Sequence, residues 1–577
     1  MSRVDEMPAA RAEVGRRFRA DADGGKLVLK LPDARAWAGP AVLLLGVAYV
    51  LVGGAAADLS GKDARLGIAA SEGFGPLGQV YGHWRPDVWP LPAAIARLVF
   101  LTGEAGKPET GAVMWPMAVA GLLAGWLVAR RFVALGRTTA ALMFGFAWFG
   151  SIALMDHAGA RGFDFLSGLA TIAALDRLLS RRSDWLAGLF ASAAFLCGGW
   201  PPLLVIGLSV LVLGRRDADF SFKLVAPPVV TAIAWFFWTI ETASAEAAAA
   251  ALVWPLTQGM AWSLPSSALG WVAAITMPID QGAAWAVPFK LLLAGLPLSP
   301  FALLLFGRSS REGMQADGGL ALDWGRVALA AVVCGVVVPG AASAAAVPAL
   351  AGLRVASAVA LAAAWNRRLA AGEGRAFLAV TTGMVVAWTS LTVYATYILT
   401  IVFTYYRPVG IVFAVGGVGV AALLWRAFET RSARRAVAAM LLMTACLKLV
   451  HAGFYVPEWS YRYGQGPWGR AIGQWLLPHW TLHTQHEWPE DLMWAVGRPV
   501  RLLSSPQHLA FPETGESRHV LLLESEFENW PESAPKLLKV ATFEPPMPFG
   551  NRRILARTEG TLTTPSGRLV SRVPAPE

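Results

Sequence analysis

Three short clusters of charged residues stand out in a chain that is otherwise poor in charge. The first is GKDARLGIAASEGFG at residues 61–75, extended by HWRPD at residues 83–87. The second is MDHAGARGFD at residues 155–164, and the third is TYYRP at residues 404–408. Their carboxylate and imidazole groups can exchange protons, and their arginines can bind anions. Because each cluster borders long apolar runs, where charge is costly to keep, these clusters are the first candidates for a functional site.

Each cluster also has a purely structural explanation, and these alternatives stay open. Ser60 can cap a helix N-terminus while Asp63, three residues later, returns the bond and completes a capping box. In the second cluster, the aspartates and the arginine can pair with one another on a solvated turn. The third cluster can be an interfacial aromatic belt with Arg407 at the lipid head groups.

The composition around these clusters is that of a protein with many membrane spans. Of 577 residues, 55% are hydrophobic and 15% are charged, and the mean hydropathy is +0.49. A soluble enzyme of this size is far more polar. The net charge of +10 does not indicate a nucleic-acid partner, because the basic residues form short clusters between apolar runs. The three cysteines lie in apolar segments, so the sequence predicts no disulfide framework.

Apolar runs of roughly 18 to 25 residues predict about thirteen transmembrane helices. They lie at about residues 37–57, 112–132, 138–158, 162–179, 185–198, 201–213, 224–241, 284–306, 325–345, 349–366, 376–404, 408–428 and 433–453. The first follows an Arg-rich segment without a cleavage site, so we expect a retained signal anchor. GGWPP at residues 198–202 interrupts one long run. Because proline removes backbone donors that lipid cannot replace, we expect two helices there.

Clusters of arginine and lysine recur in every second loop between the later runs, which predicts the topology. The loop at residues 242–281 has no lysine or arginine, whereas the loops on either side of it are basic. The positive-inside rule therefore predicts a cytoplasmic segment 1–36, a membrane domain 37–453 with an outer first loop 58–111, and an extracytoplasmic domain 454–577.

Shorter patterns predict the structure of the two outer segments. Residues 90–101 are expected to form an amphipathic or re-entrant helix in the first outer loop. The runs 518–526, 536–544 and 552–557 predict strands of a small α/β or mostly β domain.

A histidine-rich stretch near the start of the tail raises the question of a metal. His479, His483 and His486 have the spacing of ligands on one helix face, with Glu487 beside them. The order HExxH is missing, so we expect an interfacial loop rich in Trp and His and no divalent metal. Neither a Walker A loop nor a strand-linked GxGxxG occurs in the sequence.

Taken together, the layout resembles the GT-C fold glycosyltransferases that use polyprenyl-phosphate sugars, in particular the protein O-mannosyltransferases and lipid A aminoarabinose transferases. KDARLGIAASEG, residues 62–73, is similar to the family's Asp-Glu-Ala-x-Tyr stretch, with Asp63 at one acidic position. The segments 84–98, 153–166 and 196–208 resemble three further family segments, with Asp156 at the acidic position of the second outer turn.

The chain departs from the family pattern at three places. Lys62 stands beside Asp63 where the family has a second acid, and Arg85-Pro86-Asp87 replaces Lys-Pro-Pro. Gly199-Trp200 stands where the family has a lysine before Gly-Pro.

The resemblance implies that a sugar moves from a polyprenyl-phosphate donor to an acceptor hydroxyl or amine at the outer face. Asp63 or Asp156 would take the acceptor's proton, and Arg85, with Arg161 or Arg407, would stabilise the phosphate leaving group. The implied substrate-binding residues are Arg85, Asp87, His157, Arg161 and Arg407. The implied partners are membrane lipids, the lipid-linked donor and an acceptor glycan, lipid or protein, in the inner membrane, with no nucleic acid.

Two other functions remain open from the sequence. A catalytically silent scaffold would keep the fold and use its outer domain to bind a partner. A transporter would place charges at mid-membrane on broken helices in two repeats. Lys290 and Lys448 are scattered candidates for such charges, and no repeat is visible.

Overall fold

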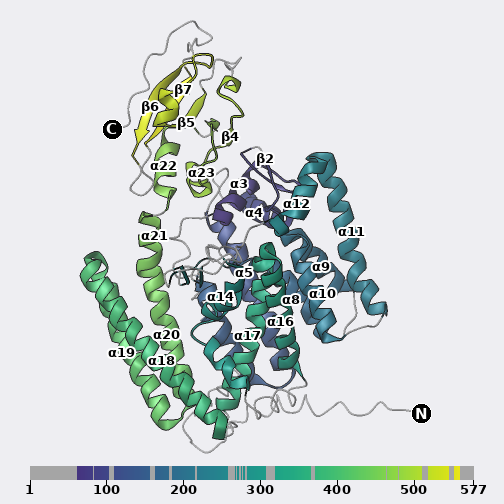
Figure 1. The fold of residues 1–577 in the computed structure, drawn as a ribbon, viewed down its shortest axis with the longest axis vertical. Coiled ribbons are helices and arrows are strands. Elements are labelled where there is room, and N and C mark those ends of the chain that lie inside the picture. Colours follow the sequence, from purple (N-terminus) through teal and green to yellow (C-terminus); the bar gives the residue numbers. More distant parts are fainter. Residues whose placement is uncertain are drawn as a thin grey trace, which may run out of the picture. The chain divides into compact units, whose positions relative to one another are not determined.

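A computed structural model of the protein shows a helical membrane-type domain and a small C-terminal α/β domain (Figure 1). The structure describes residues 61–81, 83–102, 110–155, 163–180, 185–214, 218–257, 267, 270–271, 274–275, 277, 279, 283–306, 319–365, 371–462, 464–477, 480–509, 518–544 and 552–558. The predicted signal anchor at 37–57 and its cytoplasmic segment lie outside the described residues.

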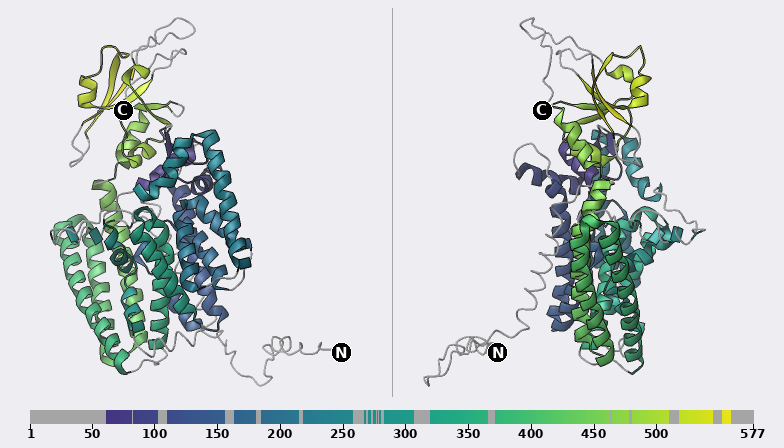
Figure 2. Two further views of the ribbon diagram at one scale, coloured as in Figure 1. Left: turned by 45° about the vertical axis from the view of Figure 1, so that its right-hand side comes forward. Right: turned by 90° about the vertical axis from the view of Figure 1, so that its left-hand side faces the viewer.

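Seven of the described helices are long and apolar enough to cross a membrane. They are α5 (Thr110–Ala134), α11 (Ala218–Thr242), α16 (Leu320–Val337), α17 (Ala342–Trp365), α18 (Ala371–Tyr397), α19 (Arg407–Thr430) and α20 (Ala433–Val450). Two π-helical turns, Ile398–Val402 and His451–Tyr455, continue α18 and α20. Figure 2 shows these last three long helices side by side, in agreement with their contacts.

Shorter helices fill the rest of the membrane-type domain. They are α6 (Thr138–Phe149), α7 (Ile152–Met155), α8 (Phe165–Leu179), α9 (Trp185–Gly198), α10 (Pro201–Leu213), α12 (Ala245–Thr257) and α14 (Val287–Ala294), with 3₁₀ turns at Ala284–Ala286, Ser299–Phe306 and Pro339–Ala341. Every span predicted from residue 112 onward therefore overlaps helical segments among the described residues. The predicted span 138–158 is divided between α6 and α7, and the span 284–306 between α14 and 3₁₀ turns, while the span 325–345 contains the end of α16 and the start of α17. The total of thirteen spans stays a prediction.

The helix α17 forms the centre of this domain. Its apolar window is 89% buried, compared with 22% for α11 and 17% for α18. Half of its residues are alanine, and these small side chains let α16, α6 and α8 pack closely against it. The peripheral helices α11 and α18 expose large apolar side chains, as helices that face lipid do.

The predicted break at GGWPP is confirmed. Gly199 has φ +73°, which ends α9, and Pro201 and Pro202 occupy the first two positions of α10, where a missing N–H costs little. A Cβ atom on Gly199 would lie 2.3 Å from the ring of Trp89. Glycine is therefore needed here both for the turn and for the close approach of Trp89.

The segment predicted to be the first outer loop, called the outer loop below, forms the helix α3 (Gly61–Glu72), an antiparallel hairpin of β1 (Gly78–Val80) and β2 (His83–Arg85), and the helix α4 (Pro90–Thr102). The predicted helix at 90–101 is confirmed as α4. Ser60 lies outside the described residues, so the predicted capping box stays a prediction. Trp235 of α11 donates its indole N–H to the carbonyl of Pro76 at 2.8 Å, which fixes the loop to the membrane-type domain.

The C-terminal domain has a five-stranded sheet in the order β4-β3-β5-β7-β6. Its elements are α21 (Val456–Arg462), α22 (Gly466–Gln474), β3 (Leu482–Thr484), α23 (Glu490–Val496), β4 (Val500–Leu502), β5 (His519–Leu523), α24 (Glu524–Glu528), β6 (Leu537–Phe543) and β7 (Arg553–Thr558). β3 pairs in parallel with β4 and β5, whereas β7 pairs antiparallel with β5 and β6, with Leu521 opposite Leu555.

The three predicted strands correspond to β5, β6 and β7, so these predictions are confirmed. The domain is of the α/β kind. Its apolar core is continuous with that of the outer loop, because Ala64 and Ile68 of α3 pack in one cluster with Leu492 and Leu521. The outer loop and the C-terminal domain therefore stabilise one another.

Candidate active site

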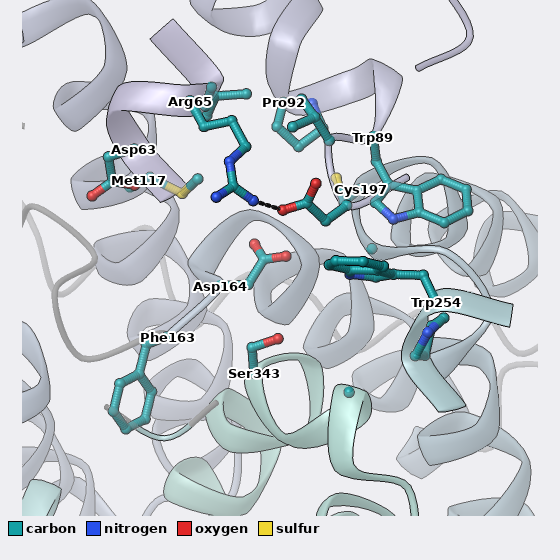
Figure 3. Close-up of a pocket in the computed structure, with 16 residues that line it drawn as sticks. Asp63, Arg65, Trp89, Pro92, Met117, Phe163, Asp164, Cys197, Trp254 and Ser343 are labelled. Atoms are coloured by element: carbon teal, nitrogen blue, oxygen red, sulfur yellow. Dashed lines mark hydrogen bonds and ion pairs between the residues drawn. The ribbon is translucent and has the colours of Figure 1, made fainter. Parts of the chain in front are cut away.

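A cavity of about 140 Å³ lies where the outer loop meets the ends of several membrane-type helices (Figure 3). Three carboxylates and one guanidinium line it: Asp63, Asp87, Asp164 and Arg65. Its other described lining residues are Leu66, Val88, Trp89, Pro92, Met117, Phe163, Cys197, Gly198, Trp254, Pro255, Gly340 and Ser343. They come from α3, α4, α5, α9, α12 and α17, from the segment before α8 and from the turn before α17. Charged groups are thus gathered in a largely apolar setting, which strengthens electrostatic interactions.

Asp63 reaches this cavity from the first turn of α3. Its side chain is only 6% exposed and lies beside Met117 in Figure 3. The N-terminus of a helix favours a negative charge, so the position suits a buried carboxylate. The prediction that Asp63 is a catalytic residue at the outer face stays a prediction.

Arg65, two residues later, is the cation of the cavity. It donates through Nε and Nη2 to Oε1 of Glu490 at 3.0 and 2.5 Å, and through Nη1 to Asp87. Burial alone would lower the pKa of Arg65, but the carboxylates of Asp87 and Glu490 outweigh it and raise the pKa above its ordinary value. Glu490 is in α23, so the C-terminal domain holds the cation of the cavity in place.

Asp164 was not among the predicted site residues. It caps the N-terminus of α8, where its carboxylate accepts the backbone N–H of Ser167 at 3.0 Å. Figure 3 shows the Asp164 carboxylate and the Arg65 guanidinium pointing into the same space. The sequence signal was present, since Asp164 closes the second charged cluster, but an aspartate before an apolar run is most simply explained as a cap.

Aromatic side chains form one wall of the cavity. Trp89 packs against Phe195 and Trp235, with ring centroids 5.5 and 5.0 Å away. On the neighbouring side, α12 contributes Trp254, and Trp200 fixes α12 by donating its indole N–H to the carbonyl of Leu252 at 2.8 Å. Because aromatic rings are rigid and these rings are held by their neighbours, this wall of the cavity has a defined position.

The other predicted site residues lie in different places. Asp87 lines the cavity and pairs with Arg65. Arg85 is in β2 and pairs with Glu487 at 2.7 Å, outside the cavity lining. Arg407 begins α19, is exposed, and does not line the cavity either. Asp156, His157 and Arg161 lie outside the described residues.

The histidines of the tail make separate contacts. Nδ1 of His483 lies 3.3 Å from the carbonyl oxygen of His519, and burial lowers the pKa of His483. Nδ1 of His486 lies 3.0 Å from Glu526. His479 is outside the described residues.

Comparison with known proteins shows a structural likeness. The ArnT protein of Cupriavidus metallidurans matches with a TM-score of 0.62 at 15% identity, over 91% of this chain and 98% of that chain, both in the apo state and bound to undecaprenyl phosphate. An oligosaccharyltransferase of Archaeoglobus fulgidus, tethered with an acceptor peptide, matches with a TM-score of 0.41 at 12% identity, over 90% of this chain and 74% of that chain. No protein-family model and no curated protein sequence matches.

The likeness to ArnT confirms the GT-C-like fold that the sequence motifs implied. Together with the long apolar helices, it identifies the chain as a membrane protein.

Proposed function

We propose that the protein is a membrane glycosyltransferase that moves a sugar from a polyprenyl-phosphate donor to an acceptor. The observation that carries this proposal is the cavity with Asp63, Asp87, Asp164 and Arg65, in a fold that matches ArnT over 98% of that chain. The undecaprenyl phosphate in one of the ArnT structures supports a lipid-phosphate donor here. In the topology predicted from the loop charges, the N-terminus is cytoplasmic, and the cavity and the C-terminal domain lie on the outer face of the inner membrane.

The reaction requires a base and a stabilised leaving group. An acceptor oxygen or nitrogen attacks the anomeric carbon, and the bond from this carbon to the phosphate oxygen breaks with its electron pair on the phosphate. Asp63 or Asp156 takes the acceptor's proton, a contribution of about 10² to 10⁴ in rate. Asp164 joins the candidates because it lines the same cavity.

Arg65 is proposed to stabilise the phosphate as it leaves. A guanidinium has five N–H donors, and the contacts to Glu490 and Asp87 use three of them, which leaves one on each Nη atom for phosphate oxygens. In the protein without donor, Asp87 and Glu490 already hold the guanidinium of Arg65 in this orientation. Asp87, Arg85, His157, Arg161 and Arg407 stay proposed substrate-binding residues. Of these, Arg85 would have to exchange Glu487 for phosphate.

The proposal is tested with purified full-length protein in liposomes and a panel of labelled polyprenyl-phosphate sugars. We expect transfer or hydrolysis with at least one donor, and its loss in Asp63→Asn and in Asp156→Asn. Glu544→Gln is a matched control, because Glu544 pairs with Arg552 at 2.9 Å on the exposed surface of the C-terminal domain. Full activity in both aspartate variants would refute their roles. No reaction with any donor would favour the silent scaffold.

A further inference from the structure

A second cavity, of about 750 Å³, lies between the outer loop and the C-terminal domain. Its walls are the C-terminal half of α3, the hairpin β1–β2, and the segment that runs from α23 into β4. Thus α3 borders both cavities: Asp63 and Arg65 line the first, and Ile68, Ser71 and Glu72 line the second. None of the functional residues predicted from the sequence lines this second cavity.

The second cavity has an apolar floor. Tyr81, Met493, Trp494 and Val500 line it and are buried. Tyr81 adopts φ +60°, which is strained for a residue with a side chain. Its hydroxyl donates to the carbonyl of Trp488, and its backbone N–H donates to Glu72, both at 3.0 Å. Strain of this kind persists where the surrounding structure holds a residue in place, and it is common at binding sites.

The rim of the second cavity is polar, and some of its side chains form no hydrogen bond with the described residues. Arg498 donates to the backbone carbonyls of Gly473, Leu476 and Gly497, so its guanidinium has a structural role in the cavity wall. By contrast, the side chains of Gln79, His83 and Arg501 line the cavity and form no hydrogen bond or ion pair with the residues that the structure describes. These planar side chains are available to a ligand.

We propose that this cavity binds a sugar unit of the acceptor. A sugar ring has an apolar C–H face, which suits the aromatic floor, and a rim of hydroxyl groups, which suits Gln79, His83 and Arg501. The volume is within the range of about 300 to 1,000 Å³ that small-ligand sites occupy, and a charged rim disfavours a hydrocarbon chain.

The inference rests on the proposed function and narrows the acceptor to a glycan or a glycan-bearing molecule. Asp63 and Glu72 are nine residues apart on α3, which is about 14 Å along the helix axis. An acceptor with one sugar in the second cavity therefore needs only a short extension to bring a hydroxyl to Asp63.

An extended peptide is the competing ligand. The cavity includes β4, the edge strand of the sheet, and an edge strand can pair with a peptide. We favour the sugar because β4 has only three residues and Pro499, which has no N–H, precedes it.

The test measures binding separately from transfer. Detergent-solubilised full-length protein is applied, without donor, to an array of neutral and acidic oligosaccharides and a matched array of extended peptides. We expect a subset of oligosaccharides to bind, and Gln79→Ala and Arg501→Ala to weaken this binding at least about tenfold. Ser71→Trp, which places a large side chain in the cavity from the exposed surface of α3, should abolish it. Arg552→Ala, on the exposed surface of the same domain, is the matched control.

Donor hydrolysis by the same variants separates the two proposals. Loss of sugar binding with unchanged hydrolysis of the polyprenyl-phosphate donor supports the acceptor site. If wild-type protein binds sugars but hydrolyses no donor, the proposed function fails while the sugar site stands. Binding of peptides alone, no sugar binding, or sugar binding that all three cavity variants leave unchanged would overturn the inference.

Discussion

The two ends of helix α8 hold aspartates in opposite electrostatic settings. Near its C-terminal end, Asp176 is 2% exposed and accepts from Arg130 at 2.6 Å and from Arg131 at 2.5 Å. At its N-terminus, twelve residues earlier and about 18 Å away along the helix axis, Asp164 lines a cavity whose described lining includes three aspartates and one arginine. Among the described residues, one end has more cations than carboxylates, and the other has more carboxylates than cations.

This difference separates a structural from a functional arrangement of charge. Two arginines on one aspartate satisfy its lone pairs, and Arg131 also binds the backbone carbonyl of Asp176 at 2.6 Å, which neutralises the C-terminus of α8. Asp164 also caps α8, but three aspartates beside one arginine in the described lining leave an excess of negative charge at the cavity, which suits a group that must accept a proton. We therefore expect substitutions at the two ends to affect different properties.

The largest effect is expected at Asp63. Asp63→Asn removes the proposed proton acceptor but keeps the size of the side chain. Sugar transfer should fall by about 10² to 10⁴ in kcat, with the melting temperature close to that of the wild type. Steady-state transfer assays and thermal unfolding of the same preparation measure both quantities. Unchanged kcat together with a lower melting temperature would show that Asp63 has a structural role like that of Asp176.

The converse result is expected at Asp176. Asp176→Asn leaves two arginines without their carboxylate and should lower the free energy of unfolding by about 2 kcal/mol. This is less than for a fully buried pair, because Arg130 and Arg131 are 40% and 25% exposed and can reach water. Thermal unfolding in detergent measures the loss. Donor binding by the folded fraction should not change, and a specific loss of binding would contradict the division between the two ends.

The sequence predicted the elements of this comparison better than it predicted their partners. The helices could be predicted from the apolar runs and from GGWPP, because a helix that faces lipid needs an uninterrupted run of apolar residues. Asp63 and Asp87 were recognised from local motifs in the outer loop. Arg65 was within the first motif, but its role depends on Glu490, which is 425 residues away along the chain. No local pattern contains such a contact.

Two further differences between prediction and structure also arise from contacts between residues that are distant in the sequence. Arg85 has the residue type expected for phosphate binding, yet it pairs with Glu487 of the tail. Strands β3 and β4 have three residues each, too few for a recognisable alternation; β3 pairs with β5, and β4 pairs with β3. In each case, tertiary contacts with the C-terminal domain decide the outcome.

A smaller effect on activity is expected from Glu490, which acts through Arg65. Glu490→Gln keeps one acceptor for the guanidinium but removes its charge, so Arg65 should be drawn toward Asp87 and positioned less well for phosphate. We expect kcat/KM for the donor to fall by about tenfold, or about 1.4 kcal/mol. Glu544→Gln, on an exposed pair in the same domain, should have no effect. Equal activity of the two variants would show that the C-terminal domain does not position the cation.

The smallest effect concerns Asp491, a partly buried carboxylate whose hydrogen bonds come from the backbone. Its Oδ2 accepts the N–H of Gln465 at 2.9 Å, and burial raises the pKa of Asp491 above its ordinary value, against its backbone hydrogen bonds. The folded state therefore takes up a proton more readily than the unfolded state, and the ionised carboxylate costs stability at pH 7. This cost disappears as the pH falls through the raised pKa. Asp491→Asn should thus raise the melting temperature at pH 7 by roughly 1 to 3 °C, and the difference from wild type should shrink on acidification. Thermal unfolding at a series of pH values measures this trend. A lower melting temperature at pH 7, as expected for Asp176→Asn, would mean that Asp491 depends on a cation in the same way.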